Sequence, residues 1–229
     1  MASMGRTWRL ALTALTLSLL ACAAGSLPGD LHKLWRTRDP KGYHVEYGYS
    51  CMGYEIAGGI GVKLAAPERE VFVMVGDGSY LMMAQELVTA VAEHVKLVVV
   101  LLQNHGFQSI GGLSQSVGSS RFGTAYRYRD PATGMLDGDK LPVDLAANAA
   151  SLGAEVVSVS TAAELEEALR AARASDRLTV VHVETDPLVG TPSSEAWWDV
   201  AIAEVSTIDE TVAARTAYEG AKLGQRGLF

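Results

Sequence analysis

The chain has 229 residues, enough for one sizeable domain at about 150 residues per domain. With 48% hydrophobic and 20% charged residues, the composition is that of an ordinary globular protein, which excludes disordered and fibrous classes. The net charge is −7 and no Lys/Arg-rich block is present, which argues against a nucleic-acid partner, because phosphate backbones are bound by clustered basic side chains. Two cysteines, Cys22 and Cys51, cannot form a disulfide scaffold, and this favours a cytoplasmic location.

The first 21 residues contradict that location. Two arginines precede an apolar stretch, Leu10–Ala21, and this combination is typical of a secretory signal. The sequence Leu19-Leu20-Ala21-Cys22 also resembles a lipoprotein processing box, so an exported or lipid-anchored form is the alternative. The apolar stretch is too short to span a bilayer, which needs about 20 apolar residues, so we expect no membrane partner. We expect instead that residues 12–23 form the first core strand.

Downstream, segments typical of strands alternate with segments typical of helices. Up to residue 102 we expect, in order, a turn at 25–29, a helix at 31–35, an irregular stretch at 37–49, a helix at 53–65, a strand at 71–75, a helix at 82–94 and a strand at 95–102. The last of these is a continuous apolar, β-branched run, which is typical of a strand buried on both faces.

The second half continues the alternation after a long loop. The Gly- and Ser-rich segment 106–128 is predicted to be that loop, and loops of this length in compact domains are usually functional. Beyond it we expect a helix at 145–152, a strand at 155–159, a helix at 161–174, a strand at 178–184 and a polar helix at 212–222. This order predicts an α/β fold, a three-layer sandwich with a largely parallel central sheet.

Polar motifs follow two of the predicted strands. The motif Gly76-Asp77-Gly78-Ser79 follows the strand at 71–75, and Asn104 follows the next predicted strand, 27 positions beyond Asp77. Ligands bind at the carboxyl ends of strands in such sheets. Carboxylate and amide oxygens suit Mg²⁺, which takes oxygen ligands that include substrate phosphates, and glycines let backbone N–H groups approach those phosphates. Gly-Asp-Gly alone is a common turn, but with the asparagine it predicts a site for Mg²⁺ and a diphosphate.

The motif and its spacing resemble the fingerprint of thiamine diphosphate (ThDP) enzymes, in which Gly-Asp-Gly is followed at a fixed interval by asparagine. From residue 22 onward, the chain resembles the C-terminal, diphosphate-binding (PP) domain of the pyruvate-oxidase-like ThDP enzymes. More narrowly, it is similar to the trihydroxycyclohexane-1,2-dione hydrolases of myo-inositol catabolism. The segments that carry this likeness are Cys22–Trp35, Glu46–Glu55, Phe122–Thr124, Tyr126–Asp130 and Ala196–Val200.

The resemblance implies three parts of the chain. Residues 1–21 are an atypical segment, 22–190 are the domain that binds ThDP diphosphate and Mg²⁺, and 191–229 are a helical tail that packs on this domain. Chains of the family continue upstream through two further domains, and the match already includes Cys22. A truncated or misread reading frame therefore explains the first residues better than export does.

The resemblance also assigns roles to individual positions. Asp77 through its carboxylate, Asn104 through its side-chain oxygen and Gly106 through its carbonyl would ligate Mg²⁺. Met52 would lie under the cofactor and force its two rings together, although it equally suits plain core packing. The residues expected to contact the cofactor are Gly25, Ser26, Ser50, Met52, Gly76, Asp77, Gly78, Ser79, Asn104 and Gly106.

Several positions keep two interpretations. Glu55, in a small and apolar helix, either faces the site or accepts a hydrogen bond, because a buried carboxylate is costly without partners. His105 is a candidate general acid, but an exposed loop histidine is the preferred interpretation. Trp197 and Trp198 are expected to be packing anchors. Ile110 stands where some decarboxylases of the family have a glutamate, which argues against decarboxylation by that proton relay.

The resemblance implies that the chain carries half of an active site and no catalytic residue. The glutamate that activates the cofactor belongs to a pyrimidine-binding (PYR) domain, so the expected partner is a chain with that domain or a further copy in a homo-oligomer. We expect a Mg–ThDP-binding half of a hydrolase that opens trihydroxycyclohexane-1,2-dione to 5-deoxy-glucuronate. The alternatives are a PP domain of an acetolactate synthase-like enzyme acting on a 2-oxo acid, and a non-catalytic remnant.

Overall fold

A computed structural model describes residues 18–192, 197 and 199–227 of the chain. The chain divides into two compact units. The first comprises the chain up to Gly106 together with Pro142–Gly190, and the second comprises Phe107–Leu141 and the chain from Thr191. The first unit contains the sheet and is described first.

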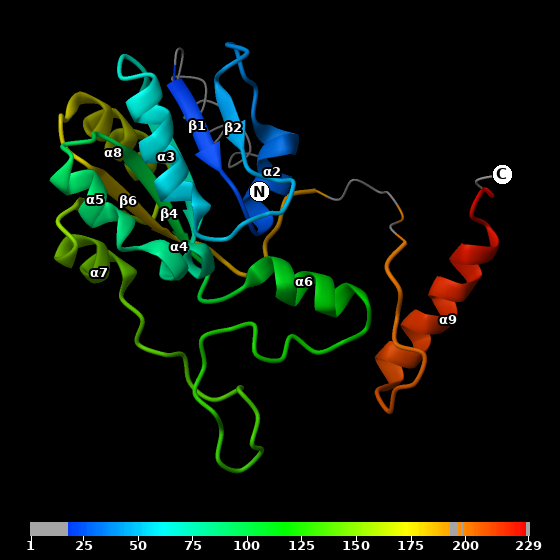
Figure 1. The fold of residues 1–229 in the computed structure, drawn as a ribbon. Coiled ribbons are helices and arrows are strands. Elements are labelled where there is room, and N and C mark those ends of the chain that lie inside the picture. Colours follow the sequence, from blue (N-terminus) through cyan, green and yellow to red (C-terminus); the bar gives the residue numbers. More distant parts are fainter. Residues whose placement is uncertain (1–17, 193–196, 198, 228–229) are drawn as a thin grey trace. The chain divides into compact units, whose positions relative to one another are not determined.

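Six parallel strands form the sheet of the first unit, in the order β2-β1-β3-β4-β6-β5 (Figure 1). Their bounds are β1 Ser18–Cys22, β2 Tyr43–Val45, β3 Glu70–Gly76, β4 Val98–Gln103, β5 Glu155–Val159 and β6 Thr179–Glu184. The predicted α/β class with a parallel central sheet is confirmed. The strand expected at the start of the chain is β1, whereas the signal-like stretch up to residue 17 lies outside the described residues.

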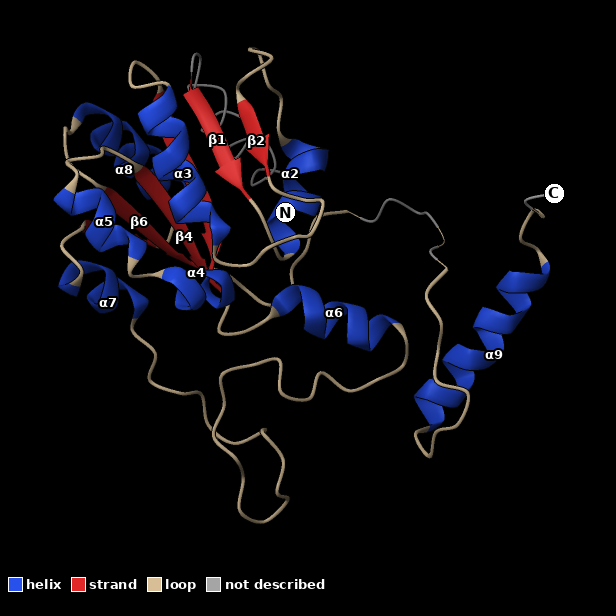
Figure 2. Ribbon diagram, viewed as in Figure 1, coloured by secondary structure: helices blue, strands red, loops and turns tan. Residues whose placement is uncertain are grey.

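Helices cover both faces of this sheet (Figure 2). They are α2 Ser26–Leu34, α3 Tyr54–Ala65, α4 Asp77–Met83, α5 Glu86–Ala92, α7 Leu145–Ser151 and α8 Ala162–Ala174. Val71, Val73 and Val75 of β3 share one core with α3, α4, α5 and α7. The alternate residues Phe72 and Met74 lie in a second core with α2 and α8, because successive side chains of a strand point to opposite faces. The result is a three-layer sandwich.

The strand order places a topological switch point between β1 and β3. From β1 the chain moves to β2 at one edge of the sheet, whereas from β3 it moves through β4 toward the other edge. Connections that leave two neighbouring strands in opposite directions open a crevice at their carboxyl ends, where ligands bind in α/β sheets. The predicted positions Gly25, Asp77 and Asn104 follow β1, β3 and β4, so they lie at this end of the sheet.

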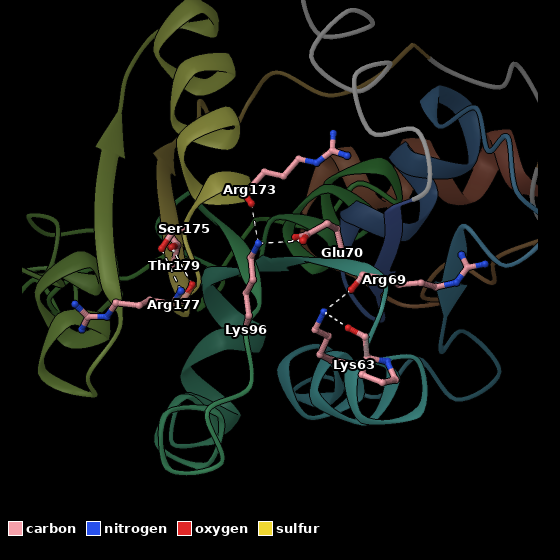
Figure 3. Close-up of polar contacts among 9 residues, drawn as sticks. Lys63, Arg69, Glu70, Lys96, Arg173, Ser175, Arg177 and Thr179 are labelled. Carbon is pink, nitrogen blue, oxygen red and sulfur yellow. Dashed lines mark hydrogen bonds and ion pairs between the residues drawn. The ribbon is translucent and has the colours of Figure 1, made fainter.

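Lysines organise the opposite end of the sheet, where the strands begin (Figure 3). The Nζ of Lys96 donates to Oε1 of Glu70 at 3.0 Å and to the carbonyl of Arg173 at 2.7 Å, which joins the start of β3 to the end of α8. The Nζ of Lys63, near the end of α3, donates to the carbonyl of Arg69 at 2.6 Å. These contacts connect helix ends to β3 far along the strands from the predicted site.

Several expectations about local structure are wrong. Helix α2 begins at Ser26, inside the segment expected to be a turn, and the helix expected at 82–94 is divided between α4 and α5. The stretch 37–49, expected to be irregular, contains the edge strand β2, whose three residues pair with Leu20, Ala21 and Cys22 of β1. A strand of that length has too few residues for a periodic signal. The segment 106–128, expected to be a loop, contains helix α6, Gln108–Ser116.

Helix α6 depends on contacts with the residues that follow it. Glycine and serine are poor helix formers, so the sequence QSIGGLSQS does not predict a helix. The guanidinium of Arg121 donates to the side chains of Gln108 and Gln115, at the two ends of the helix. The hydroxyl of Ser114 donates to the carbonyl of Ser120 at 2.9 Å. These tertiary contacts override the weak intrinsic propensity.

The tail contributes to the second unit through helix α9, Asp209–Leu223. The hydroxyl of Thr211 donates to the carbonyl of Gly118 at 2.7 Å, so the tail contacts the segment that carries α6. The ring of Trp197 lies 6.3 Å from that of Tyr218 but is 47% exposed, so its role as a packing anchor stays a prediction. Trp198 lies outside the described residues. In the part of the chain that the structure describes, no helix is both long and apolar enough to cross a membrane.

Two glycines of α3 provide a test of the packing of this helix on β3. A Cβ at Gly59 would lie 2.4 Å from Cγ2 of Val73, whereas one at exposed Gly61 would meet nothing within 4 Å. We expect Gly59→Ala to lower the free energy of unfolding by about 1–3 kcal/mol through overpacking. Gly61→Ala should raise it by about 0.5–1 kcal/mol, because alanine has the higher helix propensity. Urea denaturation of both variants measures the difference, and equal midpoints would contradict this packing.

Candidate functional site

Asp77 is the centre of the candidate site. It is the first residue of α4, directly after β3, and only 1% of its surface is exposed. Its Oδ1 accepts the N–H of Gly78 at 2.8 Å. Its Oδ2 accepts the N–H groups of Asn104 at 3.0 Å and Gly106 at 3.1 Å. One carboxylate therefore joins the start of α4 to the loop that follows β4, as the spacing of the motif predicts.

The electrostatics of Asp77 favour a cation. Burial raises the pKa of its carboxyl group. Smaller opposing contributions come from hydrogen bonds donated by the backbone of Gly106, Gly78, His105 and Asn104. Its hydrogen bonds within the described chain come from backbone N–H groups rather than from a cationic side chain. A buried carboxylate is costly unless it is paired or coordinates a metal, so a bound cation would stabilise its ionised form.

The side chain of Asn104 supplies a second oxygen. Its Oδ1 is buried and has no hydrogen-bond partner among the residues that the structure describes. Such an atom loses its hydration without compensation, and it needs a specific explanation, of which an ion is one. The described residues contain no group of three or more His, Cys, Asp or Glu side chains suited to a metal. One carboxylate with an amide oxygen fits Mg²⁺ that also takes oxygens from a phosphate ligand.

Glu55 occupies a second buried position at the same end of the sheet. It lies in the first turn of α3 and is 1% exposed. Its carboxylate accepts the N–H of Ala24 at 3.2 Å and that of Gly53 at 3.1 Å. The hydroxyl of Ser79 lies 2.7 Å from both carboxylate oxygens and donates to them. Of the two interpretations of Glu55, hydrogen bonding is the one that the structure supports.

The loop before α3 carries Ser50 and Met52 in a defined conformation. Ser50 has φ 53°, a left-handed value that is uncommon outside glycine. The carboxylate of Glu46 accepts the N–H of Cys51 at 2.7 Å and that of Tyr49 at 3.2 Å. These hydrogen bonds lower the pKa of Glu46. Met52, expected beneath the cofactor, is half-buried, and its role stays a prediction.

The predicted cofactor contacts all lie in segments that meet this end of the sheet. Gly25 and Ser26 follow β1, the motif begins at Gly76, the last residue of β3, and Asn104 begins the loop after β4. Direct hydrogen bonds link the second and third of these segments through Asp77, and the first and second through Glu55. Because the hydroxyl of Ser79 already donates to Glu55, its predicted contact with a diphosphate falls to its backbone N–H group.

A network of hydrogen-bonded polar side chains next to this loop was not predicted from the sequence. Gln103, the last residue of β4, is 1% exposed, and its Nε2 donates to the carbonyl of Val143 at 3.0 Å. Its Oε1 therefore accepts from Nε2 of His182 at 2.8 Å. The Nδ1 of His182 lies 3.1 Å from the hydroxyl of Ser158 and accepts from it. A glutamine that ends an otherwise apolar strand is the sequence signal that could have predicted this network.

His105 belongs to the same network of polar side chains. Its Nδ1 lies 3.3 Å from Nε2 of Gln103, and its Nε2 lies 3.6 Å from a carboxylate oxygen of Glu184. Its side chain is 18% exposed, so the preferred interpretation as an exposed loop histidine is wrong. His105 has φ 60°, and the two side-chain contacts help to hold this left-handed backbone between Asn104 and Gly106.

Comparison with known proteins identifies the family. The model of the thiamine pyrophosphate enzyme C-terminal TPP-binding domain, where TPP is another name for ThDP, matches residues 23–183. The chain belongs to this family. A "3D-(3,5/4)-trihydroxycyclohexane-1,2-dione hydrolase" of Bacillus thuringiensis (strain Al Hakam) is 46% identical over 197 residues, which are 86% of this chain and 31% of that protein. The protein of the same name from Bacillus cereus (strain AH820) is 45% identical over 202 residues, 88% of this chain and 31% of the relative.

A solved structure supports the fold of the TPP-binding domain. The Rhodococcus jostii RHA1 thiamine diphosphate-dependent 4-hydroxybenzoylformate decarboxylase superposes with a TM-score of 0.60 at 22% identity. The match covers 74% of this chain and 29% of that one. This chain thus spans about a third of the length of the curated relatives it matches.

The position of His182 in this buried network predicts that the free energy of unfolding depends on pH. Burial lowers the pKa of His182 below 6.5, against opposing effects of Glu184 and Asp144 and with a smaller contribution from His105. The unfolded chain therefore binds this proton at a higher pH than the folded chain does. The contribution of His182 to the free energy of unfolding is complete above about pH 6.5. It is lost as the pH falls toward the pKa of His182 in the folded chain.

We expect His182→Gln to reduce the fall in the thermal unfolding midpoint between about pH 7.5 and pH 5.5. Glutamine does not titrate, and its amide still offers a donor to Gln103. The control is His32→Gln at an exposed histidine, which should keep the parent slope. Thermal unfolding followed by circular dichroism across this pH range measures the midpoints. An unchanged dependence of the midpoint on pH in the His182 variant would contradict the lowered pKa of His182.

Proposed function

We propose that this domain binds Mg²⁺ and ThDP and forms the metal- and diphosphate-binding half of a C–C bond hydrolase. The observation that carries the proposal is the buried Oδ1 of Asn104, which has no hydrogen-bond partner among the described residues, in a residue whose backbone N–H donates to the buried carboxylate of Asp77. The family match supports the cofactor. The relatives at 45–46% identity are named as hydrolases of trihydroxycyclohexane-1,2-dione, which supports the opening of this ring to 5-deoxy-glucuronate as the reaction.

In this proposal the chain binds and orients. Asp77 and Asn104 hold Mg²⁺, with the carbonyl of Gly106 as a third ligand. Backbone N–H groups of the segments at Ser26 and Ser79 contact the diphosphate. ThDP, when bound, supplies the stabilisation of negative charge on carbon that breaking a C–C bond requires, and the protein supplies orientation and electrostatics.

The proposal includes a partner, either a chain with a PYR domain or a second copy that provides one. The helices that follow Asp77 support such a partner, because they expose the apolar side chains of Leu81, Met82, Val88 and Val91. The activating glutamate would come from that partner. We also place the protein in the cytoplasm, which its two free cysteines support.

A calorimetric titration of ThDP in the presence of Mg²⁺ tests the cofactor assignment, first with the chain alone and then with a PYR-domain partner. Binding in neither case would refute both enzyme interpretations and leave the non-catalytic remnant. Where binding is found, turnover of the cyclic dione against a 2-oxo acid separates the hydrolase from the acetolactate synthase-like alternative. The relatives at 45–46% identity, which are named as hydrolases of the cyclic dione, favour the hydrolase.

We expect Asp77→Ala to weaken Mg²⁺-dependent binding of ThDP by at least about 100-fold, because it removes a ligand as well as the acceptor that orders the following loop. The control is Asp176→Ala, at an exposed aspartate just before β6 and therefore at the other end of the strands. Calorimetry with and without Mg²⁺ measures the effect. Retained Mg²⁺-dependent affinity in the Asp77 variant would refute the ligand assignment.

A further inference from the structure

Glu55 is the common acceptor of three segments that are distant in the chain. It binds the backbone of Ala24, 31 positions away, directly before the predicted contacts Gly25 and Ser26. It binds the N–H of Gly53, directly after Met52. It also accepts the hydroxyl of Ser79, 24 positions away on α4. Each of these segments carries predicted cofactor contacts.

Two of the groups that donate to Glu55 also form a hydrogen bond with each other. The N–H of Gly53 lies 2.7 Å from Oγ of Ser79, which accepts it and in turn donates to the carboxylate of Glu55. The same N–H lies 3.1 Å from Oε2 of Glu55. A carboxyl group that is 1% exposed depends on its hydrogen bonds to remain buried, because burying a polar group without partners is costly. Because the donors come from three segments, the burial of Glu55 requires all three to be in place.

We propose that Glu55 is a positioning residue, which fixes the three segments in the one arrangement that binds ThDP. This inference rests on the proposed function. Glu55 acts through the backbone of Ala24 and Gly53 and through the hydroxyl of Ser79. Ser79 lies two residues after Asp77 on α4, so the same carboxylate also restrains the helix that presents the metal ligand.

Glu55→Gln in the full chain is the decisive variant. It keeps the size of the side chain but replaces one acceptor oxygen by an NH₂ group, which cannot accept from the converging donors. We expect the affinity for ThDP at saturating Mg²⁺ to fall by about 10–100-fold. This range is typical of residues that do not contact the bound group but hydrogen-bond to the residues that do. Isothermal titration calorimetry measures this affinity.

The chain offers a closely matched control in Glu164→Gln. Glu164, at the start of α8, accepts the backbone N–H groups of Ser160 at 2.8 Å and Thr161 at 3.1 Å, and the hydroxyl of Ser160 at 3.0 Å. It thus has the same donor set of two backbone N–H groups and one serine hydroxyl. We expect this variant to bind ThDP as the parent does, even where its unfolding midpoint falls.

Two further measurements separate positioning from a general loss of stability. In the absence of cofactor, Glu55→Gln should accelerate amide hydrogen exchange at Ala24 and Gly53 together, whereas Glu164→Gln should leave both unchanged. Ser79→Ala combined with Glu55→Gln should weaken ThDP binding no more than the stronger single change, because the two side chains act as one unit.

Parent-like ThDP affinity in Glu55→Gln, or fully additive losses in the double variant, would overturn the role of Glu55 and leave the proposed function standing. A parent chain that does not bind ThDP with Mg²⁺, alone or with a PYR-domain partner, would refute the proposed function. The cofactor role of Glu55 would then fail with it, whereas the exchange data would still decide whether Glu55 links the segments.

Discussion

A carboxylate that leaves water needs donors that converge on it, and this requirement organises the carboxyl end of the sheet. Asp77 meets it with backbone N–H groups from the start of α4 and from the loop after β4, and Glu55 meets it with groups from three segments. Neither cluster is wholly local in the sequence. The contacts of Asp77 form only when the ends of β3 and β4 are side by side, and those of Glu55 form only when the ends of β1 and β3 are. The position of the candidate site is thus a consequence of the fold, and its internal geometry is a consequence of the two buried acids.

The parallel sheet supplies the framework that brings these groups together. Both of its faces are covered, so strands such as β4 are almost wholly apolar until their last residue. Polar groups gather where the strands end, and Gln103 marks that change on β4. Its contacts with His182 and His105 continue the polar layer behind Asn104. The loop that begins at Asn104 therefore has hydrogen bonds to both Asp77 and Gln103.

The sequence was sufficient for features that depend on short-range pattern. The alternation of strands and helices predicts the sandwich, and the interval between Asp77 and Asn104 predicts their meeting at one edge. It was insufficient where tertiary contacts decide. Helix α6 forms in a glycine-rich segment because Arg121 contacts both of its ends. Glu55 was visible as an unusual acid in an apolar helix, but its partners Ala24 and Ser79 lie 31 and 24 positions away, and no spacing rule connects them.

The lysine contacts at the amino ends of the strands have a consequence for how such a domain can change its chemistry. Lys63 and Lys96 join helices to β3 at the end of the sheet remote from Asp77 and Asn104. Substitutions in the loops at the carboxyl ends can therefore alter which molecule is accepted without removing these anchors. A decarboxylase that shares the fold at only 22% identity is an example of how far sequences can diverge on one scaffold. The loops at the carboxyl ends of the strands can thus vary while the lysine contacts at the amino ends stay the same.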